Sequence, residues 1–288
     1  RRLPSVSPFR TCVRTRMEYY NQYGSCLLYK FTDKDTYWTP SGWMNGVLGV
    51  DGTKGYLVTP ADEKYVGEQL DVIEKLWFSS YSDDFLKEFL PVKIMLCSEI
   101  DSVYVTWDFS VTPVQMKYLS QEVQSWYNYD NICVSYGNIV VTQMTKEDSL
   151  AFRSSISRTF IESMIGRGKT APTTEFGESA NYDISSSDMY TASKLWAAGI
   201  PQLVNSAISE DNDWKTFMMM MVLCPEEFLT RVPEYNSDWD STSKNWDGIL
   251  NPVKDVNGLL KKRYDMVRDY FIENYNMDLQ KVGNILNR

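Results

Sequence analysis

The chain has 288 residues, of which 43% are hydrophobic and 23% charged, as in an ordinary globular protein. Its formal net charge is -9 and its basic residues form no stripe, so binding to the phosphate backbone of nucleic acid is disfavoured. No apolar run reaches the roughly 18 residues that a transmembrane segment needs. The sequence has no histidine, which excludes a Ser-His-Asp triad, a Cys-His pair, a two-His zinc site and a His general base.

The first half of the chain alternates between helical and strand patterns. Apolar residues at helical spacing predict helices, and short apolar runs bounded by turn residues predict strands. The expected helical segments are 8–20 and 62–90. The expected strands are 26–31, a hairpin joining 47–50 to 56–58, and 92–97, 102–107, 132–136 and 139–141.

The second half is mostly helical. Thr145 and Asp148 form an approximate capping box for a helix that ends near Gly166. Further helical patterns cover 191–232, 260–271 and the residues after Asp278. The order of elements predicts an α+β fold, with a small sheet in the first half and helices in the second. It predicts one domain over 1–288, or two intimate subdomains that are mixed α/β over about 1–165 and mainly helical over 166–288.

Five cysteines give no support for a structural zinc site, because no pair has CxxC spacing. Cys97 and Cys133 lie in apolar runs and are expected in the core. Pairing between Cys12 and Cys26 stays open. The calcium-loop-like run from Glu210 to Asp213 lacks the required Gly and Glu, so we expect no metal and no cofactor.

Three segments together resemble the zinc-binding metallopeptidase lipoproteins of gut Bacteroidetes, and they lie at 20–31, 77–97 and 260–279. The resemblance implies a zincin-like fold and a cell-envelope location, either as an outer-membrane lipoprotein or as a secreted protein. A lipid anchor would then lie upstream of residue 1. It also implies outer-membrane uptake proteins as partners.

The zinc helix of that family carries a motif of the form HEFxH, whose two His bind zinc and whose Glu activates water. The stretch that resembles it here is 158–162, in which Arg158 and Glu162 stand at the His positions and Thr159 at the Glu position. A further family motif, EDFAE, resembles 212–216, where Asn212 precedes the one matching residue, Asp213. Arginine cannot ligate zinc, and Arg158 could pair with Glu162 four residues later. These five residues are therefore expected to be the positions of a lost metal site, with no catalytic residue remaining.

Three functions remain open. The first is a catalytically inactive metallopeptidase-like surface lipoprotein, a binding or accessory component of nutrient uptake. The second is a glycan- or peptide-binding module unrelated to peptidases, for which aromatic rings in loop-like segments could stack on a ligand. The third is a hydrolase that uses Asp or Glu without zinc. The candidate stacking rings are Trp38, Trp43, Trp239 and Trp246.

Overall fold

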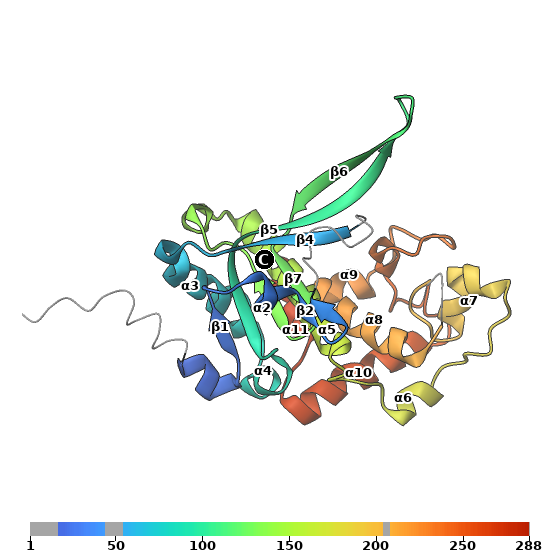
Figure 1. Cartoon of the computed structure of the whole chain (residues 1–288). Helices are drawn as coiled ribbons and strands as arrows, with labels where there is room; N and C mark the ends of the chain where they lie inside the picture. Colours follow the sequence, from blue (N-terminus) through green and yellow to red (C-terminus); the bar gives the residue numbers. More distant parts are fainter. Residues whose placement is uncertain (1–16, 44–53, 204–207, 288) are drawn as a thin grey trace, which may run out of the picture. The chain divides into compact units, whose positions relative to one another are not determined.

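The computed structural model describes residues 17–43, 54–203 and 208–287, and these divide into two compact units (Figure 1). Unit 1 comprises Arg1–Ser79 and Leu86–Arg167, whereas unit 2 comprises Ser80–Phe85 and Gly168–Arg288. The chain passes between them after Ser79, within helix α4 (Asp83–Phe89), and again after Arg167.

Unit 1 is built around a six-stranded sheet in which β5 (Lys93–Asp108) pairs with four neighbours. The inner half of β5 lies between two parallel strands, β1 (Cys26–Leu28) and β8 (Asn131–Val134). The strand β7 (Ser125–Asn128) then pairs with β8 in the antiparallel direction. The outer half of β5 lies between two antiparallel strands, β4 (Lys54–Pro60) and β6 (Gln115–Glu122). A separate two-stranded sheet joins β2 (Trp38–Thr39) to β3 (Gly42–Trp43).

Two strand predictions were wrong in this unit, and a third cannot be compared in full. The two strands expected at 92–97 and 102–107 are one continuous strand, because β4 and β6 supply backbone partners across the polar interval between them. The strand expected at 139–141 is a 3-10 helix over Ile139–Gln143, since the side chain of Asn138 accepts a hydrogen bond from the amide of Val140. The expected hairpin falls partly outside the described residues, and its second arm pairs with β5 as β4.

Helices of unit 1 cover this sheet with apolar faces. The long helix α5 (Lys146–Gly166) contacts β7, β8 and α3 (Val66–Leu76). Its capping box is confirmed: Thr145 Oγ1 accepts from the amide of Asp148, whose carboxylate accepts from the amide of Thr145. Burying each phenylalanine of its inner face contributes roughly 1.5–3 kcal/mol. The buried apolar side chains of that face are Phe152, Ile156, Phe160, Ile161 and Met164. The remaining helical segments of unit 1 are 17–23, α2 (Asp33–Tyr37), Glu63–Tyr65 and Phe78–Ser80.

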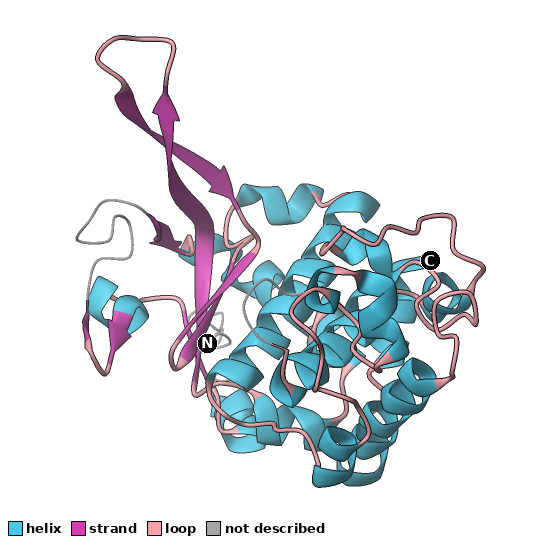
Figure 2. Ribbon diagram, turned by 90° about the vertical axis from the view of Figure 1, so that its right-hand side faces the viewer, coloured by secondary structure: helices cyan, strands magenta, loops and turns pink. Residues whose placement is uncertain are grey.

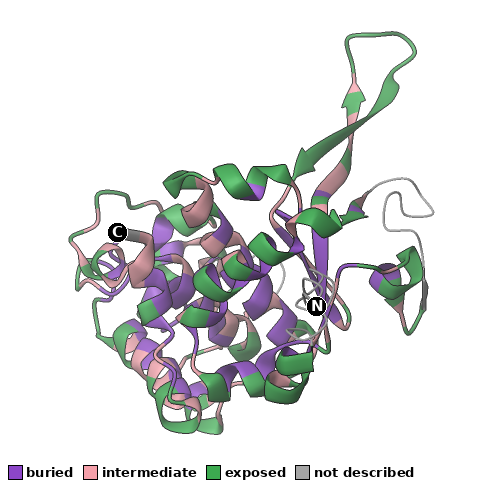
Figure 3. Ribbon diagram, turned by 90° about the vertical axis from the view of Figure 1, so that its left-hand side faces the viewer, coloured by how far each residue is buried: buried purple, intermediate pink, exposed green. Residues whose placement is uncertain are grey.

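Unit 2 is helical in its described part (Figure 2). Its central helix, α8 (Glu210–Leu223), has six consecutive buried residues, Phe217–Val222, and contacts α10 (Leu259–Tyr275) and α11 (Gln280–Asn284). Buried and exposed stretches alternate along these helices (Figure 3). The other helical segments are α6 (Thr174–Glu178), α7 (Ala192–Ala197), α9 (Glu226–Thr230), Asp188–Tyr190, Ser243–Trp246 and Ile285–Asn287.

The predicted α+β class is confirmed by the sheet of unit 1 and the helices of both units. Cys97 and Cys133 are both fully buried, as expected for core residues. None of the described helices has the length and apolar character required to cross a membrane.

Candidate functional site

The expected zinc-helix positions lie on α5, where Arg158 is exposed and Glu162 is half-buried. Among the described residues, no ion pair joins these two side chains, so the predicted salt bridge is not formed. An exposed helical pair gains only a few tenths of a kcal/mol in water, too little to hold two flexible side chains in one geometry. Arg158 therefore stands in solvent on the outer side of the helix.

Thr159, which the family resemblance predicts at the position of the catalytic Glu, is buried against the sheet. Its Oγ1 lies 2.7 Å from Oγ of Ser125 on β7, and that oxygen lies 2.7 Å from Oγ of Ser155 on α5. Three hydroxyls thus satisfy one another at the contact between α5 and β7. Thr159 joins the helix to the sheet, and it has no exposed oxygen for activating a water molecule.

Asp213, on the first turn of α8, belongs to a buried charged network in unit 2. Its Oδ2 lies 2.7 Å from Nη1 of Arg263 and accepts a hydrogen bond of 2.7 Å from the Tyr182 hydroxyl. Arg263 is fully buried, and its guanidinium lies 4.0 Å from the centre of the Phe176 ring. Burial raises the pKa of Asp213, whereas Arg263 and Tyr182 oppose that rise. Oδ2 of the carboxylate is therefore engaged by two partners within the protein.

Asn212 lies in the first turn of α8, beside Asp213. Its amide donates to Oγ of the N-cap residue Ser209 at 3.3 Å, and its carbonyl accepts from the Thr216 hydroxyl at 2.7 Å. Both backbone contacts belong to the first turns of the helix. Asn212 and Asp213 lie in unit 2, whereas the α5 positions lie in unit 1.

The four candidate stacking tryptophans differ in exposure. Trp239 is 76% exposed in a loop of unit 2, and Trp38 is 39% exposed, with its ring centre 5.3 Å from that of Tyr129. Trp43 is the cross-strand partner of Trp38, but its side chain lies outside the described residues. Trp246 is only 4% exposed, because the short 3-10 helix Ser243–Trp246 turns its ring into the core. The loop-like segment expected around Trp246 therefore presents no ring to a ligand.

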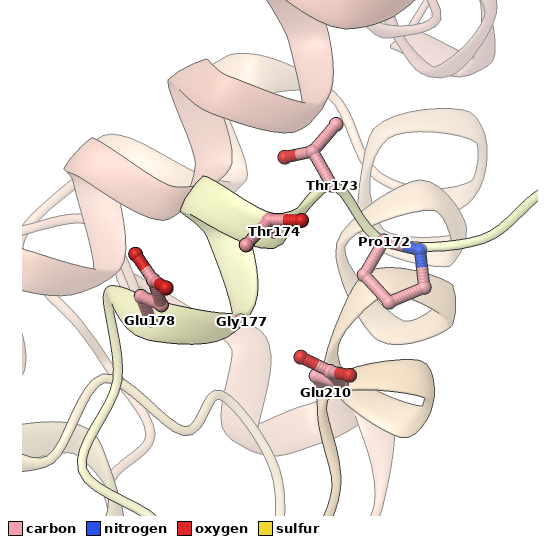
Figure 4. A pocket seen from close by; sticks show the side chains of 6 residues that line it. All are labelled: Pro172, Thr173, Thr174, Gly177, Glu178 and Glu210. Carbon is pink, nitrogen blue, oxygen red and sulfur yellow. The ribbon is translucent and has the colours of Figure 1, made fainter.

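A cavity that the sequence did not indicate lies between α6 and the start of α8 in unit 2 (Figure 4). Its volume is about 370 Å³, within the range of small-ligand sites, and it opens to solvent. Figure 4 shows Glu210 approaching from α8 the short helix that carries Glu178. The lining residues are Pro172, Thr173, Thr174, Gly177, Glu178 and Glu210.

The shape of this cavity depends on a glycine. A Cβ atom added at Gly177 would lie 1.8 Å from Oε2 of Glu210, so the carboxylate occupies the space that any other residue would fill. Thr173 caps α6 by accepting a hydrogen bond from the amide of Phe176 at 3.2 Å. Glu210 and Gly177 lie 33 positions apart, and neither has a motif around it. Sequence reasoning could therefore not pair them.

The charge of the cavity is negative. Glu178 and Glu210 contribute carboxylates, Thr173 and Thr174 contribute hydroxyls, and no basic side chain lines it. Among the described residues, neither carboxylate has an ion-pair partner. Such a lining suits an amine or guanidinium group, with hydroxyls as additional hydrogen-bonding partners.

Metal ligands do not converge in the described ranges 17–43, 54–203 and 208–287. No group of three or more His, Cys, Asp or Glu residues in them could hold a metal ion.

No family model matches the chain, and no curated protein matches it in sequence. A solved structure from Bacteroides caccae, described as a "putative zinc-binding metallo-peptidase", is similar to it with a TM-score of 0.50 and 11% identity. The similarity covers 99% of this chain and 94% of that one. At so low an identity the likeness shows the fold alone. The chain therefore has an α+β fold similar to that of a metallopeptidase-like protein.

Proposed function

We propose that this chain is a metallopeptidase-like protein of the cell envelope that binds peptides and does not cleave them. The observation that carries the proposal is the engagement of Thr159 and Asp213 in buried contacts within the fold. A catalytic acid must reach a water molecule, and a metal ligand must present a free lone pair. Thr159 has its hydroxyl in a buried trio, and Asp213 has its carboxylate against Arg263.

The absence of histidine from the whole sequence supports the same proposal. The zinc helix of the metallopeptidase family that this chain resembles needs two imidazoles on one face, one turn apart. Arg158 is a permanent cation, which repels a metal ion. The fold has thus kept its architecture while these positions have taken structural or solvent-exposed roles.

The proposed ligand is a peptide with a basic side chain or a free amino terminus. The cavity beside Glu178 and Glu210 supports this choice, since carboxylates select cations and the adjacent hydroxyls can contact a peptide backbone. The formal charge of -9 attracts cationic ligands from solution as well. In a surface lipoprotein, such binding would collect peptides for neighbouring uptake proteins.

Calorimetric titration with the peptides Gly-Lys-Gly and Gly-Glu-Gly tests the proposal. We expect the lysine peptide to bind and the glutamate peptide not to bind. Glu210→Gln should weaken binding at least about tenfold, the loss of roughly one charge-assisted hydrogen bond. Glu273→Gln, an exposed carboxylate on α10, is the matched control and should leave binding unchanged.

Gly177→Ala is a second substitution that tests the same cavity. The added methyl group must displace the Glu210 carboxylate, which is the flexible end of a side chain, so the fold should tolerate it. Binding should fall while the thermal midpoint stays close to that of the wild type. Equal binding by wild type, Glu210→Gln and Gly177→Ala would rule out this cavity as the peptide site.

Mass spectrometry of the titrated peptides distinguishes binding from hydrolysis. The proposal expects intact peptide after prolonged incubation, with or without added zinc. Zinc-dependent cleavage would contradict it. Cleavage that persists in a chelator and disappears in Glu178→Gln or Glu210→Gln would instead support a zinc-independent hydrolase.

Glycan binding is a second candidate function, favoured by the exposed ring of Trp239. Sugars stack on such rings through their apolar faces. A glycan array with wild type and Trp239→Ala tests it, with Tyr190→Ala as a control for another exposed aromatic ring of unit 2. Signals lost only in Trp239→Ala would support glycan binding, and an array without signals would argue against it.

A further inference from the structure

The outer half of β5 and the strand β6 form a hairpin that leaves the sheet of unit 1. Eight residue pairs join the two strands, from Asp101 opposite Glu122 to Asp108 opposite Gln115. The strand β4 accompanies β5 only as far as Tyr104, so beyond that point β6 is the one neighbour of β5 in the described chain. Figure 2 shows the two strands running out past the helices of their own unit, with a loop over 109–114 at the tip.

Large apolar side chains are exposed on both faces and at the tip of this hairpin, and Figure 3 marks its outer part as exposed. Opposed residues share a face of a two-stranded ribbon. The pair Trp107 and Met116 therefore lies on one face, and the pair Tyr104 and Leu119 lies on the other. Phe109 at the tip is 78% exposed. The exposed apolar residues of the hairpin are Tyr104, Trp107, Phe109, Val111, Val114, Met116, Tyr118 and Leu119.

This distribution distinguishes between two kinds of partner. A folded protein covers one face of a projecting ribbon, so the opposite face would be expected to be polar. A lipid surface surrounds an inserted tip on every side, and both faces then gain from apolar residues. Trp and Tyr also favour the boundary between lipid and water, because each ring has an apolar body and a polar edge.

The charges along the hairpin also favour a lipid surface as the partner. Between Ser102 and Gln121 the only charged residues are Asp108 and Lys117, and they form an ion pair with each other. Lys117 holds the pKa of Asp108 below its usual range, so the pair stays charged but contributes no net charge. The acidic residues of the strands lie at the base, at Glu99, Asp101 and Glu122. The outer hairpin is thus neutral within a strongly acidic chain.

The length of the apolar hairpin tip matches the depth to which interfacial elements enter a bilayer. With about 3.3 Å per strand residue, the tip extends about 10 Å beyond the level of Trp107 and Met116. Elements that lie in the interface bury their apolar side chains by about 5–10 Å. The ribbon has unpaired backbone groups along its outer edges in the described structure, so deeper entry into hydrocarbon would be costly.

We propose that the tip of the β5–β6 hairpin inserts into the interfacial layer of a zwitterionic lipid bilayer. Phe109, Val111 and Val114 enter first, and Trp107, Tyr104 and Tyr118 lie at the level of the headgroups. The contact rests on the hairpin alone and does not depend on the proposed peptide binding in unit 2.

Flotation of the full chain with phosphatidylcholine vesicles tests this inference. We expect the wild type to float with the vesicles and to do so nearly equally at low salt and in about 0.5 M salt, because the contact is apolar. Phe109→Asp should lower the bound fraction about tenfold or more, since it replaces a ring that would enter the lipid with a charge at the tip. The matched control is Val232→Asp in unit 2, at a residue 70% exposed, and it should float like the wild type.

Circular dichroism of Phe109→Asp checks that the hairpin variant is folded, and Val114→Ser provides a milder change at the same tip. A wild type that stays at the bottom of the gradient would overturn the proposal. So would equal flotation of wild type and Phe109→Asp. Sedimentation velocity without lipid tests whether the partner is a second copy of this chain. A wild-type dimer that Phe109→Asp converts to a monomer, together with no vesicle binding, would overturn the lipid proposal and make the hairpin a contact between two copies.

Discussion

Replacing Arg263 by methionine should destabilise unit 2 strongly, because it leaves the Asp213 carboxylate buried without its cation. Asp213 is 4% exposed and would retain the Tyr182 hydroxyl as its remaining side-chain partner. Removal of one member of a buried ion pair costs about 3–5 kcal/mol. A domain of this size has about 5–15 kcal/mol of total stability. The single substitution should therefore remove a large part of the free energy of unfolding.

Urea denaturation followed by circular dichroism measures this loss. The control is Lys261→Met on the same helix, whose ammonium forms an exposed ion pair with Asp265 at 2.6 Å and should cost less than about 0.5 kcal/mol. Adding Asp213→Asn to Arg263→Met should restore more than about 1 kcal/mol, since it removes the uncompensated charge. A loss below about 1 kcal/mol for Arg263→Met, or no recovery in the double variant, would refute the role assigned to this network.

Two further predictions concern backbone packing and pH. Gly283→Ala should lower the free energy of unfolding by about 1–3 kcal/mol, because the added Cβ would lie 2.2 Å from the Met221 carbonyl oxygen. Gly67→Ala, whose Cβ would meet nothing within 4 Å, should raise it by about 0.5–1 kcal/mol, and thermal unfolding of the two variants measures the difference. Burial lowers the pKa of Lys254 to about 8, so above that pH the unfolded chain holds more protons and the folded state gains stability. The difference in unfolding free energy between wild type and Lys254→Met should therefore rise by about 1–2 kcal/mol from about pH 7.5 to about 9.5, and a difference independent of pH would contradict the shift.

The sequence predicts those parts of the fold that depend on nearby residues. The helix after Thr145 was predicted to its end at Gly166, because the capping box and the terminal glycine are local signals. The helix α8 likewise lies within the helical pattern predicted over 191–232. β6 was not predicted, because all eight of its residues are exposed and its pairing depends on β5 alone. Such a strand has no buried face to give it an alternating pattern.

The candidate site was predicted less well than the fold, for a related reason. Position along the chain led to Thr159 and Asp213, but only their neighbours in space, Ser125 and Arg263, show that both are engaged in packing. The cavity at Glu210 depends on a close approach to Gly177 on a different helix. A contact of this kind has no signature in either local sequence.

Metal analysis of the purified full chain tests the central claim most directly. After incubation with excess zinc and dialysis, mass spectrometry of the elements should find well under one zinc per chain. That result is predicted because the sequence lacks histidine and the motif positions Arg158, Thr159 and Glu162 offer no set of zinc ligands. Stoichiometric zinc that remains after dialysis would contradict the account, whether or not the test peptides are cleaved.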